Sequence, residues 1–85
     1  MKQFEFTIKD ELGIHARPAG MLAKLAKSFE SDITITKGDK TVNAGKLIAL
    51  MGMGIKCNDT ITICIDGADE EQAAVEIENF LNENL

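Results

Sequence analysis

The strongest constraint on the fold is an alternation of isoleucine or phenylalanine with polar residues in three separate stretches. They read FEFTI at residues 4–8, DITITK at 32–37 and TITICID at 60–66. Because successive side chains of a β-strand point to opposite faces, each stretch has one apolar face and one polar face rich in threonine. Strands of this kind are typical of an antiparallel sheet that is covered on one side only. The sequence therefore predicts a sheet whose apolar face is covered by helices.

A short additional strand is predicted around Thr41 and Val42. It follows the turn signal KGDK at residues 37–40, which is suited to joining two antiparallel strands. With the helices described next, the predicted element order is β-α-β-β-α-β-α. The predicted class is α+β, with a sheet and three helices in layers.

Three helices are predicted from apolar residues at helical spacing, over residues 16–29, 46–52 and 69–84. The apolar arc of the first helix comprises Met21, Leu22, Leu25 and Phe29. A basic arc lies opposite and comprises Arg17, Lys24 and Lys27. The last helix is expected to bury Ala73, Ala74, Ile77, Phe80 and Leu81. Proline disfavours a helical conformation in the residue before it, so the first helix begins either at Ala16 or at Pro18.

The length of the chain limits where chemistry can occur. A chain of 85 residues is expected to form one domain over residues 1–85, and it buries about 60% of its unfolded surface. We therefore expect its chemistry at the surface and not in an internal cleft. No apolar run approaches the ~20 residues that span a bilayer, and the start of the chain does not resemble a signal peptide. The sequence predicts a cytoplasmic protein without membrane insertion, in which Cys57 and Cys64 are reduced thiols.

Charge is distributed unevenly along the chain, whose net charge is −5. Residues 1–56 hold all nine basic residues and six acidic residues, a net charge of +3, whereas residues 57–85 hold eight acidic residues and no lysine or arginine. An acidic partner would be attracted to the first of these parts. A nucleic acid is a poor candidate partner, because the total charge is acidic and no Trp or Tyr is present for base stacking.

The only histidine, His15, lies in the stretch LGIHARPAG at residues 12–20. A single histidine is more often a structural or surface residue than a reactive one. Three local features favour a reactive role here. His15 lies at the start of a predicted helix, where free N–H groups and the helix dipole attract an anion. Arg17 adds a cation suited to phosphate, and Pro18 makes the first turn rigid.

Other chemistries have less support from the sequence. A metal site would combine His15 with cysteines more than about forty residues away, at no recognised ligand spacing. A Cys–His nucleophilic pair is also unsupported, because Cys64 is predicted on the polar face of the sheet. The glycines of GMGI at residues 52–55 match no phosphate-binding loop. A nucleophilic imidazole beside anion-stabilising groups remains, which indicates a group carrier that is not itself an enzyme and has no cofactor.

GIHARPAG at residues 13–20 closely resembles the motif of the HPr family, the histidine-containing phosphocarriers of the bacterial phosphoenolpyruvate:sugar phosphotransferase system. VN at 42–43, MGMGI at 51–55 and GADEEQA at 67–73 also resemble the family, so the resemblance covers essentially the whole chain. It implies an open-faced β-sandwich, with a four-stranded antiparallel sheet of order 1-4-2-3 and three helices on one face. It also implies that enzyme I phosphorylates His15 on Nδ1 and that His15 donates the phosphoryl group to enzyme IIA domains.

The resemblance further implies a docking surface for these partners on the His15 loop, the outer face of the first helix and the short second helix. Its expected residues are Ala16, Arg17, Gly20, Lys24, Lys27, Lys46, Leu47, Ile48 and Met51. Apolar residues at helical spacing usually belong to the core, so Leu47, Ile48 and Met51 have two interpretations. We expect at least two of them to be exposed, as an apolar patch surrounded by lysines. The carrier itself is expected to be a monomer.

Position 46 departs from the pattern of many family members. HPr proteins of low-GC Gram-positive bacteria often carry a serine there, which an ATP-dependent kinase phosphorylates. Lys46 cannot accept that phosphate, and the only serines of the chain are Ser28 and Ser31. Regulation through a serine at this position is therefore not expected. Lys46 either extends the basic docking rim or reflects drift at a tolerated surface site.

Two classes of function remain open from the sequence. In the first, the chain is a phosphocarrier of sugar uptake. In the second, it is an HPr-like regulatory module that acts by binding partners and not by sugar-linked transfer. The presence of His15, Arg17 and Pro18 together favours the phosphocarrier.

Overall fold

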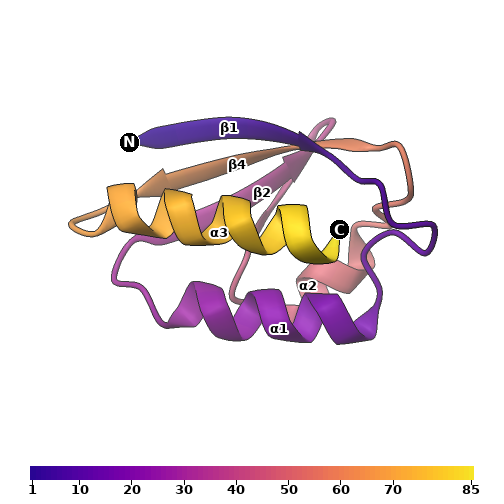
Figure 1. Ribbon diagram of the computed structural model, residues 1–85, viewed down its shortest axis with the longest axis horizontal. Coiled ribbons are helices and arrows are strands. Elements are labelled where there is room, and N and C mark those ends of the chain that lie inside the picture. The colour runs from indigo at the N-terminus through magenta and orange to yellow at the C-terminus, as the bar shows by residue number, and fades with distance from the viewer.

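Seven secondary-structure elements follow one another in the order that the sequence predicts. The computed structural model describes residues 1–85. The elements are β1 (Lys2–Thr7), α1 (Ala16–Lys27), β2 (Asp32–Lys37), β3 (Lys40–Asn43), α2 (Leu47–Gly52), β4 (Thr60–Asp66) and α3 (Glu70–Asn84). The α+β class is thereby confirmed, and Figure 1 shows the path of the chain.

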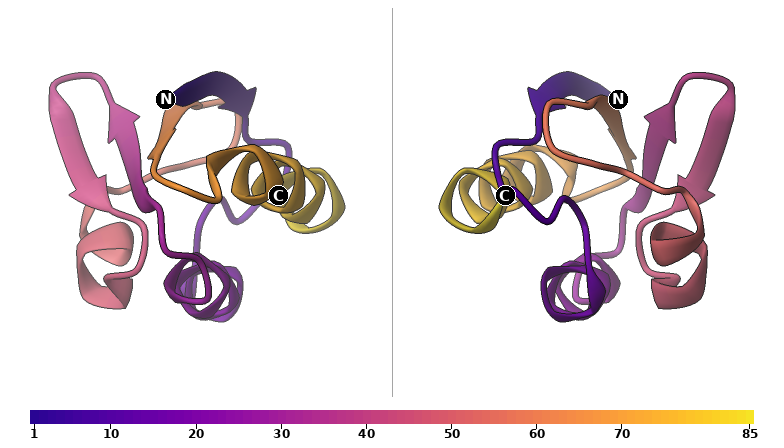
Figure 2. Two further views of the ribbon diagram at one scale, coloured as in Figure 1. Left: turned by 90° about the vertical axis from the view of Figure 1, so that its left-hand side faces the viewer. Right: turned by 90° about the vertical axis from the view of Figure 1, so that its right-hand side faces the viewer.

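The four strands form one sheet in the order β1-β4-β2-β3, with every neighbouring pair antiparallel. This is the order that the family resemblance implies. Ile63 of β4 pairs with Phe4 of β1 on one side and with Ile35 of β2 on the other. Cross-strand pairs of this kind bring the apolar side chains to one face of the sheet. Figure 2 shows that all three helices lie on one side of the sheet and leave its other face open.

The core lies between the sheet and the helices and comprises 19 buried apolar residues. Its largest fully buried side chains are Ile8, Leu22, Ile35, Leu50, Ile61, Ile63, Ile65, Ile77 and Leu81. Removal of this apolar surface from water is the main force that holds the layers together. No helix combines the length and the apolar character that crossing a lipid bilayer requires.

The open face of the sheet is lined with threonines, as the alternation predicts. The hydroxyl groups of Thr7 and Thr60 are 2.9 Å apart, and those of Thr36 and Thr41 are 2.8 Å apart. These pairs join β1 to β4 and β2 to β3 across the sheet. The polar face therefore adds hydrogen bonds between the strands that the apolar face holds by packing.

The first helix differs from its predicted extent at its end. α1 begins at Ala16, so the alternative start at Pro18 is wrong. Proline is tolerated in this first turn because its missing N–H would have no helical acceptor. The helix ends at Lys27, two residues earlier than predicted, because the backbone N–H and the hydroxyl of Ser28 both donate to the carbonyl oxygen of Leu25.

Smaller corrections concern the other elements. β1 extends over Lys2–Thr7 and not over residues 4–8, because its backbone pairing with β4 starts before the alternating stretch. α2 and α3 each begin one residue later than predicted. Met21, predicted on the apolar arc of α1, is 43% exposed. The buried set of this helix is Pro18, Ala19, Leu22, Ala23 and Ala26, so three alanines belong to the buried arc and Met21 does not.

Candidate functional site

The loop before α1 determines where His15 lies. Asp10 begins a turn in which its Oδ1 accepts the N–H of Leu12 at 2.8 Å and its carbonyl oxygen accepts that of Gly13 at 2.9 Å. Aspartate is typical at such positions because its short side chain can bond the backbone two residues on. Gly13 has a φ of +68°, which residues with a side chain rarely adopt. The turn leads the chain to the start of α1.

Gly13 also lies directly against the segment that precedes β4. A Cβ atom at this position would collide with the carbonyl oxygen of Ile55 and would lie 2.7 Å from the Cα of Lys56. The next residue, Ile14, donates its N–H to the same Ile55 oxygen at 3.1 Å. The two residues before His15 are therefore held against residues 55 and 56.

The end of α3 supports the same loop from another side. The carbonyl oxygen of Leu85 accepts the N–H groups of Lys9 at 2.6 Å and of Asp10 at 2.8 Å, and the Leu85 side chain is buried. In Figure 1 the last turn of α3, the loop and the start of α1 lie on the same side of the molecule. Segments from both ends of the sequence thus meet around His15.

His15 is the N-cap residue of α1 and has an extended backbone. Its carbonyl oxygen accepts the N–H of Ala19 at 2.9 Å, whereas its imidazole makes no capping hydrogen bond. The backbone N–H groups of Ala16 and Arg17 donate to no backbone acceptor, and the first turn contains no acidic residue. The half-buried imidazole therefore lies at a helix N-terminus whose positive end the helix itself does not neutralise.

A shallow surface depression of about 210 Å³ contains His15. Its lining consists of Asp10, His15, Arg17, Pro18, Met21, Glu83 and Asn84. Pro18 is buried and restricts the first turn of α1, whereas Arg17 is exposed and takes part in none of the ion pairs of the molecule. An exposed guanidinium without an ion-pair partner can bind a phosphoryl group through two parallel hydrogen bonds.

Four residues of this depression were not predicted from the sequence. They are Asp10, Met21, Glu83 and Asn84. Asp10 has a local signal, since it begins a turn that ends at a glycine shortly before the histidine. The residues near the end of α3 have none, because only tertiary packing brings them to His15. Two carboxylates, on Asp10 and Glu83, thus line the same depression as His15 and Arg17.

The outer face of α1 carries the residues that the docking prediction placed there. Ala16, Arg17, Lys24 and Lys27 are exposed, and Gly20 is half-buried. A Cβ atom at Gly20 would have no neighbour within 4 Å, so open space lies beside this position. A Cβ atom at Gly45, just before α2, would lie 3.2 Å from Cγ of Lys27. The start of α2 is therefore adjacent to the basic arc of α1.

Apolar side chains of α2 are directed to solvent. Ile48 is 81% exposed, Met51 43% and Leu47 37%. The expectation that at least two of them are exposed is confirmed, and α2 contributes only Leu50 to the buried core. Lys46 is the N-cap residue of α2, is exposed, and forms no ion pair. An apolar patch beside several free cations thus lies next to α1.

Neither cysteine lines the depression that contains His15. The thiol of Cys57 is 3.7 Å from the carbonyl oxygen of Lys9, and that of Cys64 is 3.4 Å from Oε1 of Gln3. Both cysteines are unpaired and half-buried. No three or more His, Cys, Asp or Glu side chains are arranged as a group that could hold a metal ion.

Comparison with known proteins places the chain in a family. A family model described as the PTS HPr component phosphorylation site matches residues 2–83. The chain belongs to the HPr family. The phosphocarrier protein HPr of Mycoplasma genitalium is 46% identical to it over 85 residues, which covers 99% of this chain and 97% of the relative. These matches support a phosphocarrier role in the phosphotransferase system.

Solved HPr structures have the same fold. A mycoplasma histidine-containing phosphocarrier protein matches with a TM-score of 0.94 and 40% identity, covering 96% of this chain and 93% of that chain. HPr-C-His from Thermoanaerobacter tengcongensis matches with a TM-score of 0.93 and 31% identity, covering 98% of this chain and 93% of that chain. The open-faced sandwich that the resemblance implies is therefore confirmed.

Proposed function

We propose that this HPr-type phosphocarrier works in the cytoplasm and carries phosphoryl groups on Nδ1 of His15, from enzyme I to the enzyme IIA domains of sugar permeases. In the first step a bond forms between Nδ1 and phosphorus while the bond between phosphorus and enzyme I breaks. In the second step the N–P bond breaks, a bond to the IIA domain forms, and the imidazole leaves. Positioning and charge stabilisation supply most of what such transfers require.

The observation that carries this proposal is the position of His15 at the uncompensated N-terminus of α1. The N–H groups of Ala16 and Arg17 lack backbone acceptors, and no acidic side chain occupies the first turn. A phosphoryl group on the neighbouring imidazole would add negative charge where the helix dipole favours it. The Arg17 guanidinium lines the same depression and can bind two phosphoryl oxygens. Pro18 supports the proposal by keeping this turn rigid.

Enzyme I and the IIA domains would dock on the adjoining surfaces of α1 and α2. The proposed docking surface consists of Ala16, Arg17, Gly20, Lys24, Lys27, Lys46, Leu47, Ile48 and Met51. Its exposed apolar side chains on α2 would be buried by a partner, and its lysines would attract acidic groups. A small apolar patch with a charged rim suits partners that bind, transfer and dissociate.

Serine-based regulation is absent from this proposal. Lys46 caps α2 where a regulatory serine would have to lie. Ser28 ends α1, where its hydroxyl donates to the carbonyl oxygen of Leu25. Ser31 is only 7% exposed, and its hydroxyl is bonded to Asp69. Neither serine lies on the proposed docking surface, so phosphorylation of a serine there has no candidate acceptor.

Transfer of radiolabelled phosphate tests the proposal. The chain is incubated with enzyme I and labelled phosphoenolpyruvate, and then with an IIA domain. We expect label that is labile in acid and stable in alkali, as an N–P bond is, and that is absent from His15→Ala. Label that survives this substitution would rule out His15 as the acceptor. Circular dichroism of the variant serves as the folding control.

The second candidate function, a regulatory binding module, predicts a different result in the same assay. Such a module would bind its partner without passing label to a IIA domain. The family model supports the carrier, because it is described by a phosphorylation site. Labelled chain that binds a IIA domain but never transfers its phosphate would favour the regulatory module instead.

A further inference from the structure

The loop of residues 54–59, which joins α2 to β4, supports the segment that leads to His15. Its Ile55 carbonyl oxygen accepts the N–H of Ile14 at 3.1 Å. At the start of the same segment, Ile8 exchanges backbone hydrogen bonds of 2.7 and 2.9 Å with the last two residues of the loop, Asn58 and Asp59. The chain from residue 8 to residue 14 is thus bonded to the 54–59 loop at both of its ends.

One lysine of the sheet holds both ends of this loop. Lys37, the last residue of β2, donates from Nζ to the carbonyl oxygen of Gly54 at 3.0 Å and lies 2.8 Å from Oδ2 of Asp59. The Asp59 carboxylate also accepts the N–H of Lys56 at 2.8 Å. The hydrogen bond from Lys37 and the one from Lys56 hold the pKa of Asp59 below its usual value. Lys37 therefore connects the beginning, the middle and the end of the loop.

One residue of the loop other than glycine has a left-handed backbone. It is Asn58, with a φ of +74°. Residues other than glycine rarely adopt a left-handed conformation, and surrounding contacts have to maintain it. The Lys37 and Asp59 side chains are 32% and 30% exposed, so their contact is partly shielded from water. Loss of the ammonium group would remove this donor from the Gly54 carbonyl oxygen and would leave the half-buried Asp59 carboxylate with the Lys56 N–H but no cation.

We propose that Lys37 is a positioning residue for phosphoryl transfer, because it keeps the 54–59 loop in the shape that holds Ile14, and hence His15, at the start of α1. The inference rests on the proposed function, since its effect is exerted on transfer through His15. Lys37 is not among the residues that line the His15 depression. Its effect passes through the loop and the backbone hydrogen bond from Ile14 to Ile55.

The chain contains a matched control for this lysine. Lys40 pairs with Lys37 across the β2–β3 hairpin, is exposed, and forms no ion pair. Lys37→Met and Lys40→Met remove the same charge from the same hairpin. Lys37→Arg keeps a cation with several N–H donors. Lys37→Gln is a milder variant that preserves the experiment if Lys37→Met does not fold.

Amide hydrogen exchange tests the structural half of the proposal without any transfer reaction. In Lys37→Met or Lys37→Gln, the N–H groups of Ile14 and Asn58 should exchange about tenfold faster than in the parent chain, through local opening of the loop. Amides of the central strand β4 should be unaffected. Lys40→Met should leave the Ile14 and Asn58 amides unchanged, and Lys37→Arg should restore most of their protection. Unchanged exchange in Lys37→Met would overturn the proposal.

Steady-state transfer from enzyme I, with the chain as the varied substrate, tests the functional half. The expected result is a kcat about three- to tenfold lower for Lys37→Met with little change in KM, because the surfaces of α1 and α2 are intact. Lys37→Arg should recover kcat, and measurements well below the melting temperature exclude global unfolding as the cause. Equal kcat values for Lys37→Met and Lys40→Met would overturn the proposal. Failure of the proposed function is separate, since it shows as label that persists in His15→Ala or as labelled parent chain that never passes its phosphate to a IIA domain.

Discussion

The starts of α1 and α3 are built from the same helical geometry and treat its positive end in opposite ways. In α1, His15 is the N-cap residue and no carboxylate occupies the first turn. Arg17 adds the positive charge of its guanidinium to the positive end of the helix dipole. In α3, Asp69 is the N-cap residue, and both Glu70 and Glu71 lie in the first turn. The depression at the start of α3, about 440 Å³, has three acidic side chains and no basic one in its lining, whereas that of α1 combines histidine and arginine with two carboxylates from outside the helix.

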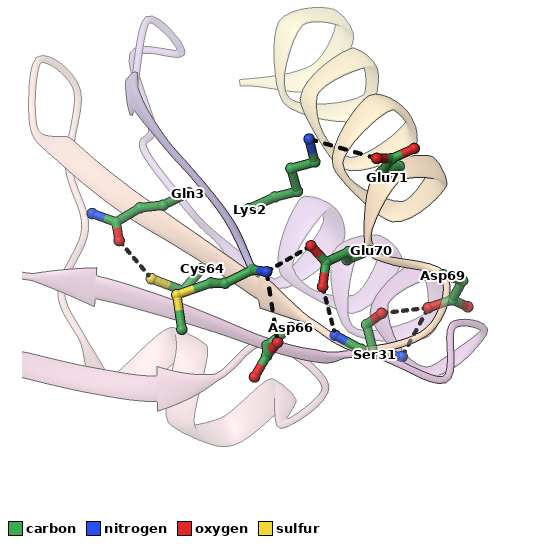
Figure 3. Close-up of polar contacts among 10 residues, drawn as sticks. Lys2, Gln3, Ser31, Cys64, Asp66, Asp69, Glu70 and Glu71 are labelled. Carbon is green, nitrogen blue, oxygen red and sulfur yellow. Dashed lines mark hydrogen bonds and ion pairs between the residues drawn. The ribbon is translucent and has the colours of Figure 1, made fainter.

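Two carboxylates at the start of α3, those of Asp69 and Glu70, also bond other segments of the chain. Asp69 accepts the N–H of Glu30 at 2.8 Å and that of Ser31 at 2.9 Å, and it bonds the Ser31 hydroxyl. Glu70 lies 2.7 Å from the ammonium group of Met1 and accepts the N–H of Gly67 at 3.2 Å. Figure 3 shows Ser31, from the connection between α1 and β2, in contact with Asp69. The partners of Glu70 directly precede β1 and follow β4. At the start of α3, carboxylates neutralise the positive helix end and also bond it to other segments of the chain. At the start of α1, no carboxylate of the first turn does so, and an external anion can bind there.

The largest expected effect comes from giving α1 the acidic first turn of α3. In Ala16→Glu, a carboxylate would compete with the phosphoryl group for the helix N-terminus and for Arg17. We expect transfer from enzyme I to fall by about tenfold or more. The free energy of unfolding should be unchanged or rise by up to about 1 kcal/mol, because an acid suits this position.

Ala16→Gln is the matched control, since it adds the same bulk without the charge. The comparison of the two helix starts requires that Ala16→Gln transfers faster than Ala16→Glu at low salt. If both variants are equally slow, steric obstruction of the docking surface explains the loss. The absence of an acid from the first turn of α1 then has no electrostatic effect on transfer.

A second, stability-based effect is expected from Asp69→Ala at the start of α3. This change removes the acceptor of three hydrogen bonds that join α3 to the residues before β2. We expect the melting temperature to fall by several degrees, while transfer at 25 °C stays within about twofold of the parent. Asp66→Ala is the control, because its exposed carboxylate has only a 3.8 Å ion pair. An equal fall in both variants would contradict a special role for Asp69.

Low pH should weaken the contacts at the start of α3 and so lower the free energy of unfolding. The Ser31 hydroxyl bond and the N–H bonds from the chain hold the pKa of Asp69 low, and the bond with the terminal ammonium lowers the pKa of Glu70. A depressed folded-state pKa contributes stability above the unfolded pKa, which is lost as pH falls through the folded value. Urea unfolding should therefore show falling stability below about pH 4. In Asp69→Ala this dependence should be shallower, and an identical slope would contradict the assignment.

The smallest effect is expected at the start of α2, where Lys46 is the N-cap residue and no acid lies in the first turn. Lys46→Glu should reduce the association rate with enzyme I by about two- to threefold at low salt, because a rim charge mainly affects encounter. The difference should shrink as salt is added. Stopped-flow binding at two ionic strengths measures it, with Lys40→Glu as a control away from the docking surface. Unchanged rates at low salt would leave drift as the explanation of Lys46.

Local patterns predicted the strands better than the helix ends. Alternation located Ile33, Ile35, Ile61, Ile63 and Ile65 on the buried face, because a strand has only two faces to choose between. The strand order was implied only by the family resemblance, since alternation does not say which strand lies beside which. Met21 is exposed because it lies outside the arc of α1 that is buried, which Ala19, Leu22, Ala23 and Ala26 form, and the prediction centred that arc on the larger apolar residues.

The site was predicted to the extent that its residues are neighbours in sequence. His15, Arg17 and Pro18 lie within one helical turn, so helix-terminus physics alone brings them together. Glu83 joins them only because α3 packs back against the first loop. The sequence indicated only a turn at Lys37. No periodicity or motif predicts its contacts with a loop about twenty residues away.

The antiparallel pairing of β1 with β4 has a consequence for the order of events during synthesis. Lys2 pairs with Ile65, so the first strand made has no partner until most of the chain has left the ribosome. The bond between Ile14 and Ile55 is delayed for the same reason. Pairing over such sequence distances closes late and slowly. A nascent chain with its histidine already outside the ribosome therefore still lacks the contacts that hold His15 at the start of α1, and these contacts form only when the last third is being translated.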